Sequence, residues 1–471
     1  MDTDRLLAHV SRFWDEEILP TLTEFIRIPN ESPHFDRDWA AAGHMERAVG
    51  LVTDWIAARG LPGVTVEVLR AEGRTPLILA EVPGDRPEVV LVYGHIDKQP
   101  PMTGWREGLG PWSPVLDGEG RLYGRGGADD GYAVFAAMAV AAALRAAGLP
   151  HATLRLLVEC SEESGSPDLP HYLQAHGDRF GDPSLVICLD SGCGNYDQVW
   201  GTTSLRGLVS GTLQVEVATE GVHSGIAGGI VPSPARILRL LLDRLEDPAT
   251  GALRPPELSV AVPPARRAQA EAAAAVLGAD VHRFFPLLEG VQPERSDPTA
   301  LLLRNAWEPT LTLTAQEGLP PPAKGGNVLL PGLKVAYSLR IPPTLPVAEA
   351  AAAVRRVLEA DPPHGARVRV TAGGQPGWEA PPMAPWLEQA LAAGSREFFG
   401  REACFFGVGG SIPFMHLMGE RFPAAQFLIT GVLGPHANAH GPNEFLHVPY
   451  AKRLTCALVR VVAAHRAALE A

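Results

Sequence analysis

Seven side chains that can bind a metal ion or move a proton are spread along this chain. In chain order they are His95, Asp97, Asp129, Glu162, Glu163, Asp190 and His440. Imidazole nitrogens and carboxylate oxygens form a mixed ligand set that suits zinc, manganese or cobalt better than calcium or copper. The set is large enough for two metal ions about 3.5–4 Å apart, which need a bridging carboxylate and a bridging hydroxide. One Glu then remains as a general base.

His95 and Asp97 follow the apolar run 87–93, which reads as a buried strand that Gly94 ends. If the chain stays extended there, the two side chains point to the same face. A neutral imidazole binds a divalent cation, and a carboxylate beside it orients the ring. A His and an Asp at a strand end also form ordinary hydrogen-bonded loop pairs, so this pair decides little by itself.

Two further apolar strands lead directly into acidic side chains. The strand 152–160 is followed by Glu162 and Glu163, and the strand 184–189 is followed by Asp190. Paired carboxylates are costly to bury because like charges repel, and a bound cation removes that cost; in a solvated turn they need no ion. The alternation of strands and helices in this half predicts an α/β sheet, in which sites collect at the carboxyl ends of strands.

The remaining candidates lie in loops. The glycine-rich run 122–131 brings Asp129 and Asp130 to the start of an Ala-rich helix. Helix capping explains Asp130 but leaves the close backbone approach to Asp129 unexplained. The run matches neither GxGxxG nor GxxxxGK[ST], which argues against a phosphate loop. The loop 435–444 carries two His and an Asn, and it reads either as a metal-ligand loop containing His440 or as ordinary surface.

Composition narrows the class of protein. The 471 residues predict two domains, and the net charge of −13 disfavours nucleic acid and anionic membranes as partners. Five scattered Cys without a CxxC pair fit a reducing cytoplasm. The start of the chain lacks the apolar region of a signal peptide, and the apolar run 133–144 is too short to span a bilayer. We therefore expect a cytoplasmic protein that binds neither nucleic acid nor membrane.

The pattern of elements changes after about residue 201. Strands and helices of a small α+β domain follow, and we place them in a segment inserted into the larger domain. The predicted division assigns residues 1–204 and 379–471 to a catalytic, metal-binding domain and residues 205–378 to the inserted one. The long Pro/Ala/Glu-rich segment 250–308 receives no role.

Six motifs, in the same order along almost the whole chain, resemble those of the M20 metallopeptidases, and within them the carnosinase-type cytosolic dipeptidases. They are Gly-His-Ile-Asp-Lys-Gln-Pro, Tyr-Gly-Arg-Gly-Gly-Ala-Asp-Asp-Gly, Glu-Glu-Ser-Gly-Ser, Leu-Asp at 189–190, Val-His-Ser-Gly and Ala-His-Gly-Pro-Asn-Glu. The resemblance implies an α/β fold: a zinc-peptidase-like catalytic domain with a mixed central sheet, plus an inserted α+β lid/dimerisation domain. It also implies a homodimer.

The resemblance further implies a site with two divalent metal ions per subunit, usually zinc and in some members manganese. In such a site Asp129 bridges the ions. His95 and Asp190 complete one metal position, and Glu163 and His440 complete the other.

The resemblance gives the remaining side chains roles around these metals. Glu162 is the general base and Asp97 orients His95, a role that their spacing independently allows. In similar enzymes the residue matching His223 reaches the active site of the partner subunit and stabilises the tetrahedral oxyanion. The predicted substrate-binding residues are Arg340 for the carboxylate, Asn327, and Gly410 and Ser411 in the Gly-Gly-Ser-Ile-Pro turn.

The implied activity is hydrolysis of an amide bond in a dipeptide or short peptide, through a metal-bound hydroxide and the Glu general base. Two departures from the dipeptidase pattern are Val408 in place of an acidic residue and Ala372 in place of a His. Loss of the acidic group favours an acylated or bulkier substrate, so an N-acyl-amino-acid amidohydrolase or a carboxypeptidase is the alternative. A silent binding module is disfavoured by the intact Glu162, Asp129 and His440. The sequence has no G-x-S-x-G elbow, which argues against a serine or cysteine hydrolase. It has no GxGxxG after a strand, which argues against a Rossmann oxidoreductase.

Overall fold

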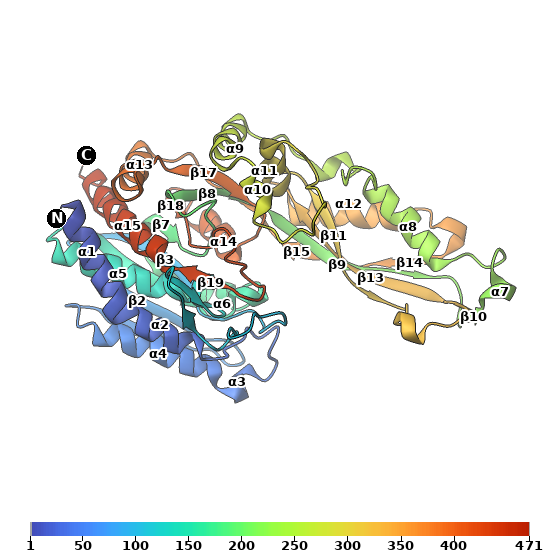
Figure 1. Cartoon of the computed structure of the whole chain (residues 1–471), viewed down its shortest axis with the longest axis horizontal. Coiled ribbons are helices and arrows are strands. Elements are labelled where there is room, and N and C mark those ends of the chain that lie inside the picture. The colour runs from blue at the N-terminus through green and yellow to red at the C-terminus, as the bar shows by residue number, and fades with distance from the viewer. Residues whose placement is uncertain (1, 471) are drawn as a thin grey trace.

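The protein is an α/β body from which an elongated arm extends (Figure 1). The computed structural model describes residues 2–470, and both ends of the chain lie on the body. The central sheet of the body has nine strands in the order β1-β2-β6-β3-β7-β18-β8-β16, with β17 beside β8. These strands are β1 (Thr65–Leu69), β2 (Leu77–Val82), β3 (Arg86–His95), β6 (Ala152–Glu159), β7 (Pro183–Cys188), β8 (Trp200–Leu205), β16 (Trp378–Glu379), β17 (Cys404–Val408) and β18 (Gln426–Ile429).

The sheet is mixed, as predicted. Strands β6, β3, β7 and β18 pair in parallel, whereas β1, β2 and β16 pair antiparallel to their neighbours. Strand β3 is buried on both faces because its apolar run is unbroken: Val90 and Val92 pack into one core cluster, and Leu91 and Tyr93 into the other.

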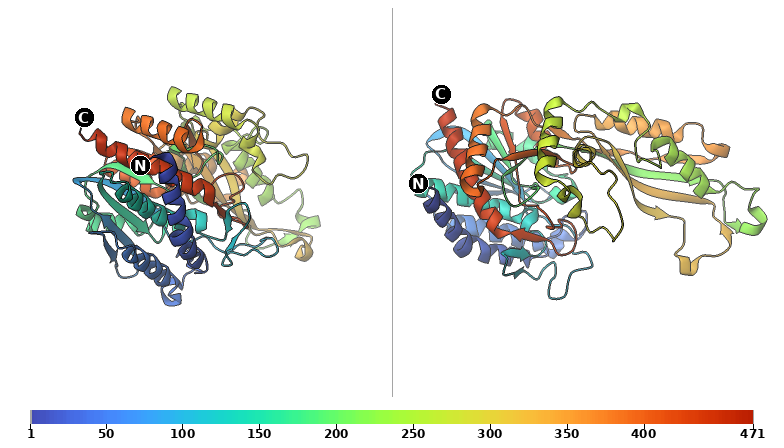
Figure 2. Two further views of the ribbon diagram at one scale, coloured as in Figure 1. Left: turned by 60° about the vertical axis from the view of Figure 1, so that its left-hand side comes forward. Right: turned by 45° about the horizontal axis from the view of Figure 1, so that its top comes forward.

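Helices cover both faces of this sheet (Figure 2). One face carries α1 (Thr3–Phe13), α2 (Leu19–Ile26), α4 (His44–Ala58), α5 (Tyr132–Ala146), α13 (Pro385–Phe399) and α15 (Val448–Ala468); the other carries α6 (Leu169–Ala175) and α14 (Pro413–Arg421). The stretch Gly127–Ala146 is long and apolar enough to cross a membrane by length and composition, but 94% of its most apolar window is buried inside the protein. It is the core helix of the body.

The arm is a five-stranded antiparallel sheet with two helices on one face (Figure 1). Its elements are β9 (Gly207–Glu216), α8 (Pro234–Leu245), β11 (Thr310–Glu317), β13 (Gly332–Ile341), α12 (Val347–Glu359), β14 (Arg367–Val370) and β15 (Gly373–Gln375). Alternate residues of β13, from Leu333 to Ile341, pack under the apolar faces of α8 and α12. The arm therefore has the α+β organisation expected of the inserted segment.

Three helices within the inserted segment pack on the body rather than on the arm. They are α9 (Pro264–Leu277), α10 (Asp280–Arg283) and α11 (Pro298–Ala306). Ala273 of α9 and Leu303 of α11 belong to the same core cluster as Cys404 of β17. The division at residues 204/205 and 378/379 stays a prediction, and this packing adds that the segment 264–306 sits at the junction of arm and body.

Candidate metal centre and active site

The carboxyl ends of three neighbouring parallel strands place the first candidates together. Strand β3 lies between β6 and β7, so that its last residue His95 is in register with Glu159 of β6. Tyr93 of β3 is likewise in register with Cys188, the last residue of β7. Side chains that follow these strands therefore meet at one edge of the sheet.

Two groups of metal-binding side chains form at this edge and share one carboxylate. In the first, Nε2 of His95 lies 3.4 Å from Oδ1 of Asp129 and 3.9 Å from Oδ1 of Asp190. In the second, Nε2 of His440 lies 3.1 Å from Oδ2 of Asp129 and 3.4 Å from Oε2 of Glu163. Within each group the donor atoms all lie within 4.8 Å of one another. Asp129 thus offers one oxygen to each group, as a bridging ligand must.

Unpaired donor atoms and raised carboxylate pKa values both indicate a cation-binding site. Nε2 of His95 and Oε1 of Glu163 are buried and have no hydrogen-bond partner among the described residues. Burial, with the charge of Asp190, raises the pKa of Glu162 well above its ordinary value, and burial with the charge of Asp129 raises that of Glu163 to about 8. Divalent ions offset this repulsion, and nitrogen and carboxylate donors suit zinc or manganese.

Asp97 connects the two donor groups, through His95 of the first and the backbone of Glu163 of the second. Its carboxylate accepts hydrogen bonds from the backbone N–H groups of Glu162, at 3.1 Å, and Glu163, at 2.9 Å. Nδ1 of His95 lies 3.1 Å from the Asp97 carbonyl and 3.4 Å from its carboxylate, which leaves Nε2 facing the metal position. Asp97 is fully buried, so these contacts are not exchanged for water.

We expect the substitution Asp97→Asn to weaken metal binding about 10- to 100-fold, because an amide has one acceptor oxygen where the carboxylate has two. Metal titration of the purified variant measures this. Asp117→Asn is the matched control, since Asp117 also accepts backbone N–H bonds, in the hairpin formed by β4 (Val115–Leu116) and β5 (Arg121–Tyr123). Equal metal affinity for wild type and Asp97→Asn would contradict the orienting role.

Glu162, the predicted general base, lies beside the first donor group without belonging to it. It belongs to neither donor group, yet its Oε2 lies 4.0 Å from Nε2 of His95. Its neighbour Glu163 takes part in the second group. The two adjacent carboxylates of the short helical turn Glu162–Ser164 therefore lie in different places relative to the donor groups.

The loop that presents Asp129 is fixed by a lysine for which the sequence predicted no role. Lys98 is fully buried, and its Nζ donates to the carbonyls of Phe25 and Ile28, each at 2.7 Å. Burial lowers the pKa of Lys98 well below its ordinary value. Gly126 (φ +78°) runs along the lysine stem, where a Cβ would lie 2.6 Å from Lys98 Cε. This close approach accounts for the glycine-rich sequence before Asp129.

The loop that presents His440 is held by a second feature that the sequence did not predict. Arg125 forms a buried ion pair with Glu444 and donates to the carbonyl of His440 at 3.1 Å. The other Glu444 oxygen accepts from the N–H of Gly126 at 2.9 Å. The glycine-rich loop and the His440 loop are therefore joined directly, although they are far apart in the sequence.

The predicted substrate-binding residues divide into two places. Arg340 of β13 donates to Oγ of Ser411 at 2.9 Å, across the junction of arm and body, with Gly410 in the same turn. Asn327 lies beside β12 (Val328–Leu329), which pairs with β10 (Val222–His223), so Asn327 and His223 are both exposed at the far end of the arm (Figure 1).

The arrangement is that of a dinuclear metal-dependent hydrolase, and comparison with known proteins gives the family. Residues 91–464 match the model of peptidase family M20/M25/M40, so the chain belongs to this family of metallopeptidases. It is 27% identical over 458 residues to cysteinylglycine-S-conjugate dipeptidase from Corynebacterium striatum, covering 93% of this chain and 94% of the relative.

Two further proteins are similar over nearly the full length. The chain is 25% identical to human Beta-Ala-His dipeptidase, covering 98% of this chain and 94% of the relative. Among solved structures, the dipeptidase Dug1p from Saccharomyces cerevisiae has the same fold, with a TM-score of 0.78, 20% identity and 98% of each chain covered. These findings confirm the predicted family and fold class.

Proposed function

We propose that the protein is a dipeptidase that hydrolyses the amide bond of small dipeptides with two divalent metal ions. The proposed metal is zinc, and manganese is the alternative. The observation that carries the proposal is Asp129, whose two oxygens face two separate donor groups, with Glu162 close by in neither group. The dipeptidase names of the similar proteins support the substrate class. We also propose a cytoplasmic homodimer.

The residues that would hold the ions are His95 and Asp190 on one side, Glu163 and His440 on the other, and Asp129 between them. Bound there, the ions would polarise the scissile carbonyl and lower the pKa of a water molecule. Glu162 takes the proton of that water and delivers it to the leaving amine. Arg340 with Ser411 binds the substrate carboxylate, a task that suits the planar guanidinium.

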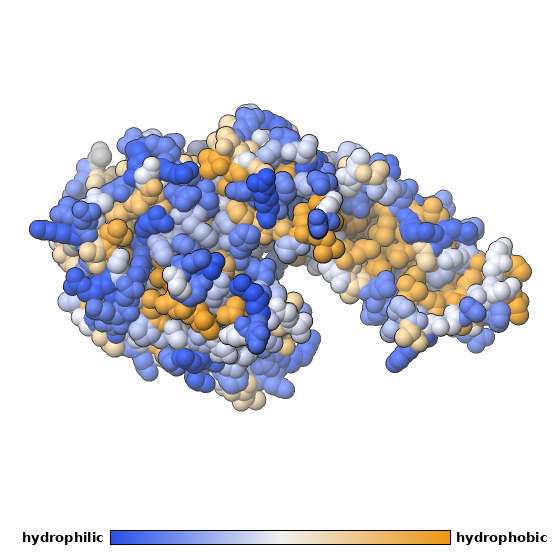
Figure 3. Space-filling view, in the orientation of Figure 1, coloured by the Kyte–Doolittle hydropathy of each residue, from blue (hydrophilic) through white to orange (hydrophobic). Residues whose placement is uncertain are grey.

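The position of His223 supports the proposed dimer. Strand β10 lies at the end of the arm that points away from the body, and its neighbours Ile226 and Ile230 are 75% and 82% exposed (Figures 1 and 3). Exposed apolar side chains at this end favour a contact with another molecule. In the proposed dimer this end lies against the partner subunit, where His223 stabilises the oxyanion.

We expect His223→Ala to lower kcat about 10²- to 10³-fold without loss of metal, as the removal of an oxyanion donor does. The trans arrangement is checked by mixing this variant with Glu162→Gln. Neither homodimer is active, but a mixed dimer has one site with both side chains intact, so activity reappears if His223 acts on the partner. If mixing restores nothing while mixed dimers form, the trans role is wrong.

The proposed function is tested by metal analysis together with hydrolysis of free dipeptides and their N-acetylated forms. About two zinc or manganese ions per chain and cleavage of free dipeptides are expected, since two donor groups are present. Activity on acylated substrates alone would keep the metal centre and replace the dipeptidase by an N-acyl-amino-acid amidohydrolase. Absence of bound metal after reconstitution would contradict the proposal.

A further inference from the structure

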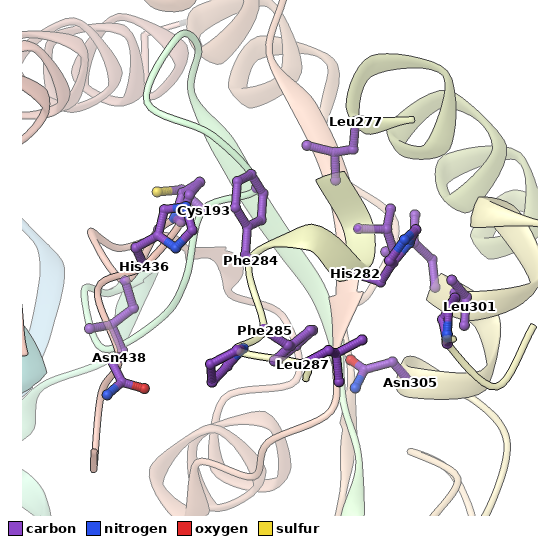
Figure 4. A pocket seen from close by; sticks show the side chains of 18 of the residues that line it. Cys193, Leu277, His282, Phe284, Phe285, Leu287, Leu301, Asn305, His436 and Asn438 are labelled. Carbon is purple, nitrogen blue, oxygen red and sulfur yellow. The ribbon is translucent and has the colours of Figure 1, made fainter. Parts of the chain in front are cut away.

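A large cavity opens between the body and the inserted helices, and its lining includes Asn438 and Pro442 of the loop that carries His440 (Figure 4). Its volume is about 990 Å³, at the upper end of the range for small-molecule sites. One wall comes from the loops that follow Asp190 and precede His440, through Cys193 and Asn438. The opposite wall comes from the segment 277–305, for which the sequence predicted no role.

The segment 277–305 reaches the metal-binding loop itself. The ring of Phe284 contacts that of His436 edge to face, with centroids 5.3 Å apart. Phe284, Phe285, Leu287 and Leu301 give this wall an apolar character, and Figure 4 shows these side chains gathered around the space together with Asn305. The cavity is therefore suited to a hydrophobic group.

The cavity also adjoins the proposed carboxylate-binding residues. Thr310 of β11 lines it and is in register with Arg340 of β13. Asn305 packs on the turn that contains Ser411, since a Cβ on Gly409 would meet its amide at 2.8 Å. Arg206, buried between them, donates to Thr310 Oγ1 at 2.9 Å and to the Gly409 carbonyl at 3.3 Å.

Neither Arg206 nor Arg340 has a carboxylate within ion-pair distance among residues 2–470. Burial, together with the charges of Arg340 and Arg304, lowers the pKa of Arg206 to about 9, and burial also lowers the pKa of Arg340. A buried and a half-buried cation without an acidic partner favour an anionic group beside them. The substrate carboxylate supplies that charge.

We propose that this cavity is the subsite for the side chain of the C-terminal residue of the substrate, and that it selects a large apolar side chain. The inference depends on the proposed dipeptidase function. The Cα of the C-terminal residue carries both the carboxylate and the side chain. When the carboxylate lies at Arg340, the side chain can therefore enter the cavity beside Thr310. The aromatic wall from the segment 277–305 then sets the preference by excluding water from an apolar side chain.

The test compares Ala-Phe with Ala-Gly as substrates of the metal-loaded enzyme. We expect wild-type kcat/KM to favour Ala-Phe about 10- to 200-fold, as apolar pockets do for well-fitting groups. Asn305→Trp fills the cavity from an exposed helix position and should lower kcat/KM for Ala-Phe at least about 10-fold while Ala-Gly changes little. Leu287→Trp, on the exposed segment, provides a second filling variant in case the first folds poorly.

Glu271→Trp is the matched control, because it adds the same bulk to the exposed side of α9, outside the cavity. It should leave both substrates unaffected. A wild type that cleaves Ala-Phe and Ala-Gly equally well would contradict the subsite alone. Equal losses for both substrates in the filling variants would also contradict it. A wild type that cleaves neither dipeptide would contradict the proposed function, and with it the subsite.

Discussion

Replacement of Glu162 by Gln is expected to abolish most of the activity while both metal ions stay bound. The amide has the size of the carboxylate but cannot take a proton from water, and loss of a general base lowers kcat by about 10²- to 10⁴-fold. Metal binding should persist because Glu162 belongs to neither donor group. The measurement is kcat on a dipeptide, paired with the metal content of the same preparation.

The neighbouring Glu163→Gln variant separates a base from a ligand. Glu163 faces His440 and Asp129 in the second donor group, so its amide should reduce the metal content as well as the rate. Glu119→Gln, on the exposed hairpin between β4 and β5, controls for the chemical change and should alter neither quantity. A metal-loaded Glu162→Gln enzyme with nearly normal kcat would assign the proton transfer to another residue.

The central strands of the body could be predicted from the sequence because they are largely apolar and buried. The unbroken apolar run that became β3 leaves little choice of structure, and β6 and β7 contain buried apolar runs of the same kind. Strand β8 is different: it is buried throughout, yet it contains Thr202, Thr203 and Ser204. The hydroxyl of Thr202 is hydrogen-bonded to Ser191 and that of Thr203 to Gln269. No local sequence pattern predicts these partners.

The inserted helices were missed for a related reason. Helix α9 buries Ala270, Ala273 and Ala274 against the body, and small side chains interleaved with Gln and Glu give only a weak apolar stripe. The sequence therefore showed composition without periodicity across the segment 250–308. Its packing at the junction depends on β17, which lies about a hundred residues later in the chain.

The candidate site was predictable where it follows strands and less so where it depends on distant contacts. His95 and Asp190 follow parallel neighbours, so their meeting is a consequence of sheet geometry. The position of His440 depends instead on the Arg125–Glu444 ion pair, which joins two loops that are distant in sequence. A buried lysine such as Lys98 is equally invisible, because lysines are almost always exposed.

Replacement of Asp129 is expected to have the largest effect, since it is the one side chain common to both donor groups. Its Oδ1 faces His95 and its Oδ2 faces His440, and although burial opposes ionisation, the nearby imidazole rings hold the pKa of Asp129 well below its ordinary value. In Asp129→Asn one of these oxygens becomes an NH₂ group, which cannot bind a cation. We expect both metal positions to weaken together, with activity at background.

Metal content by elemental analysis, followed by titration of the apo variant, measures this coupling. Asp130→Asn is the matched control: Asp130 is adjacent and equally buried, and its Oδ2 accepts the backbone N–H of His95 at 3.3 Å, but it belongs to neither donor group. It should keep two ions. If Asp129→Asn retained one ion at wild-type affinity, that metal position would not use the Asp129 carboxylate. The bridging role of Asp129 would then be wrong.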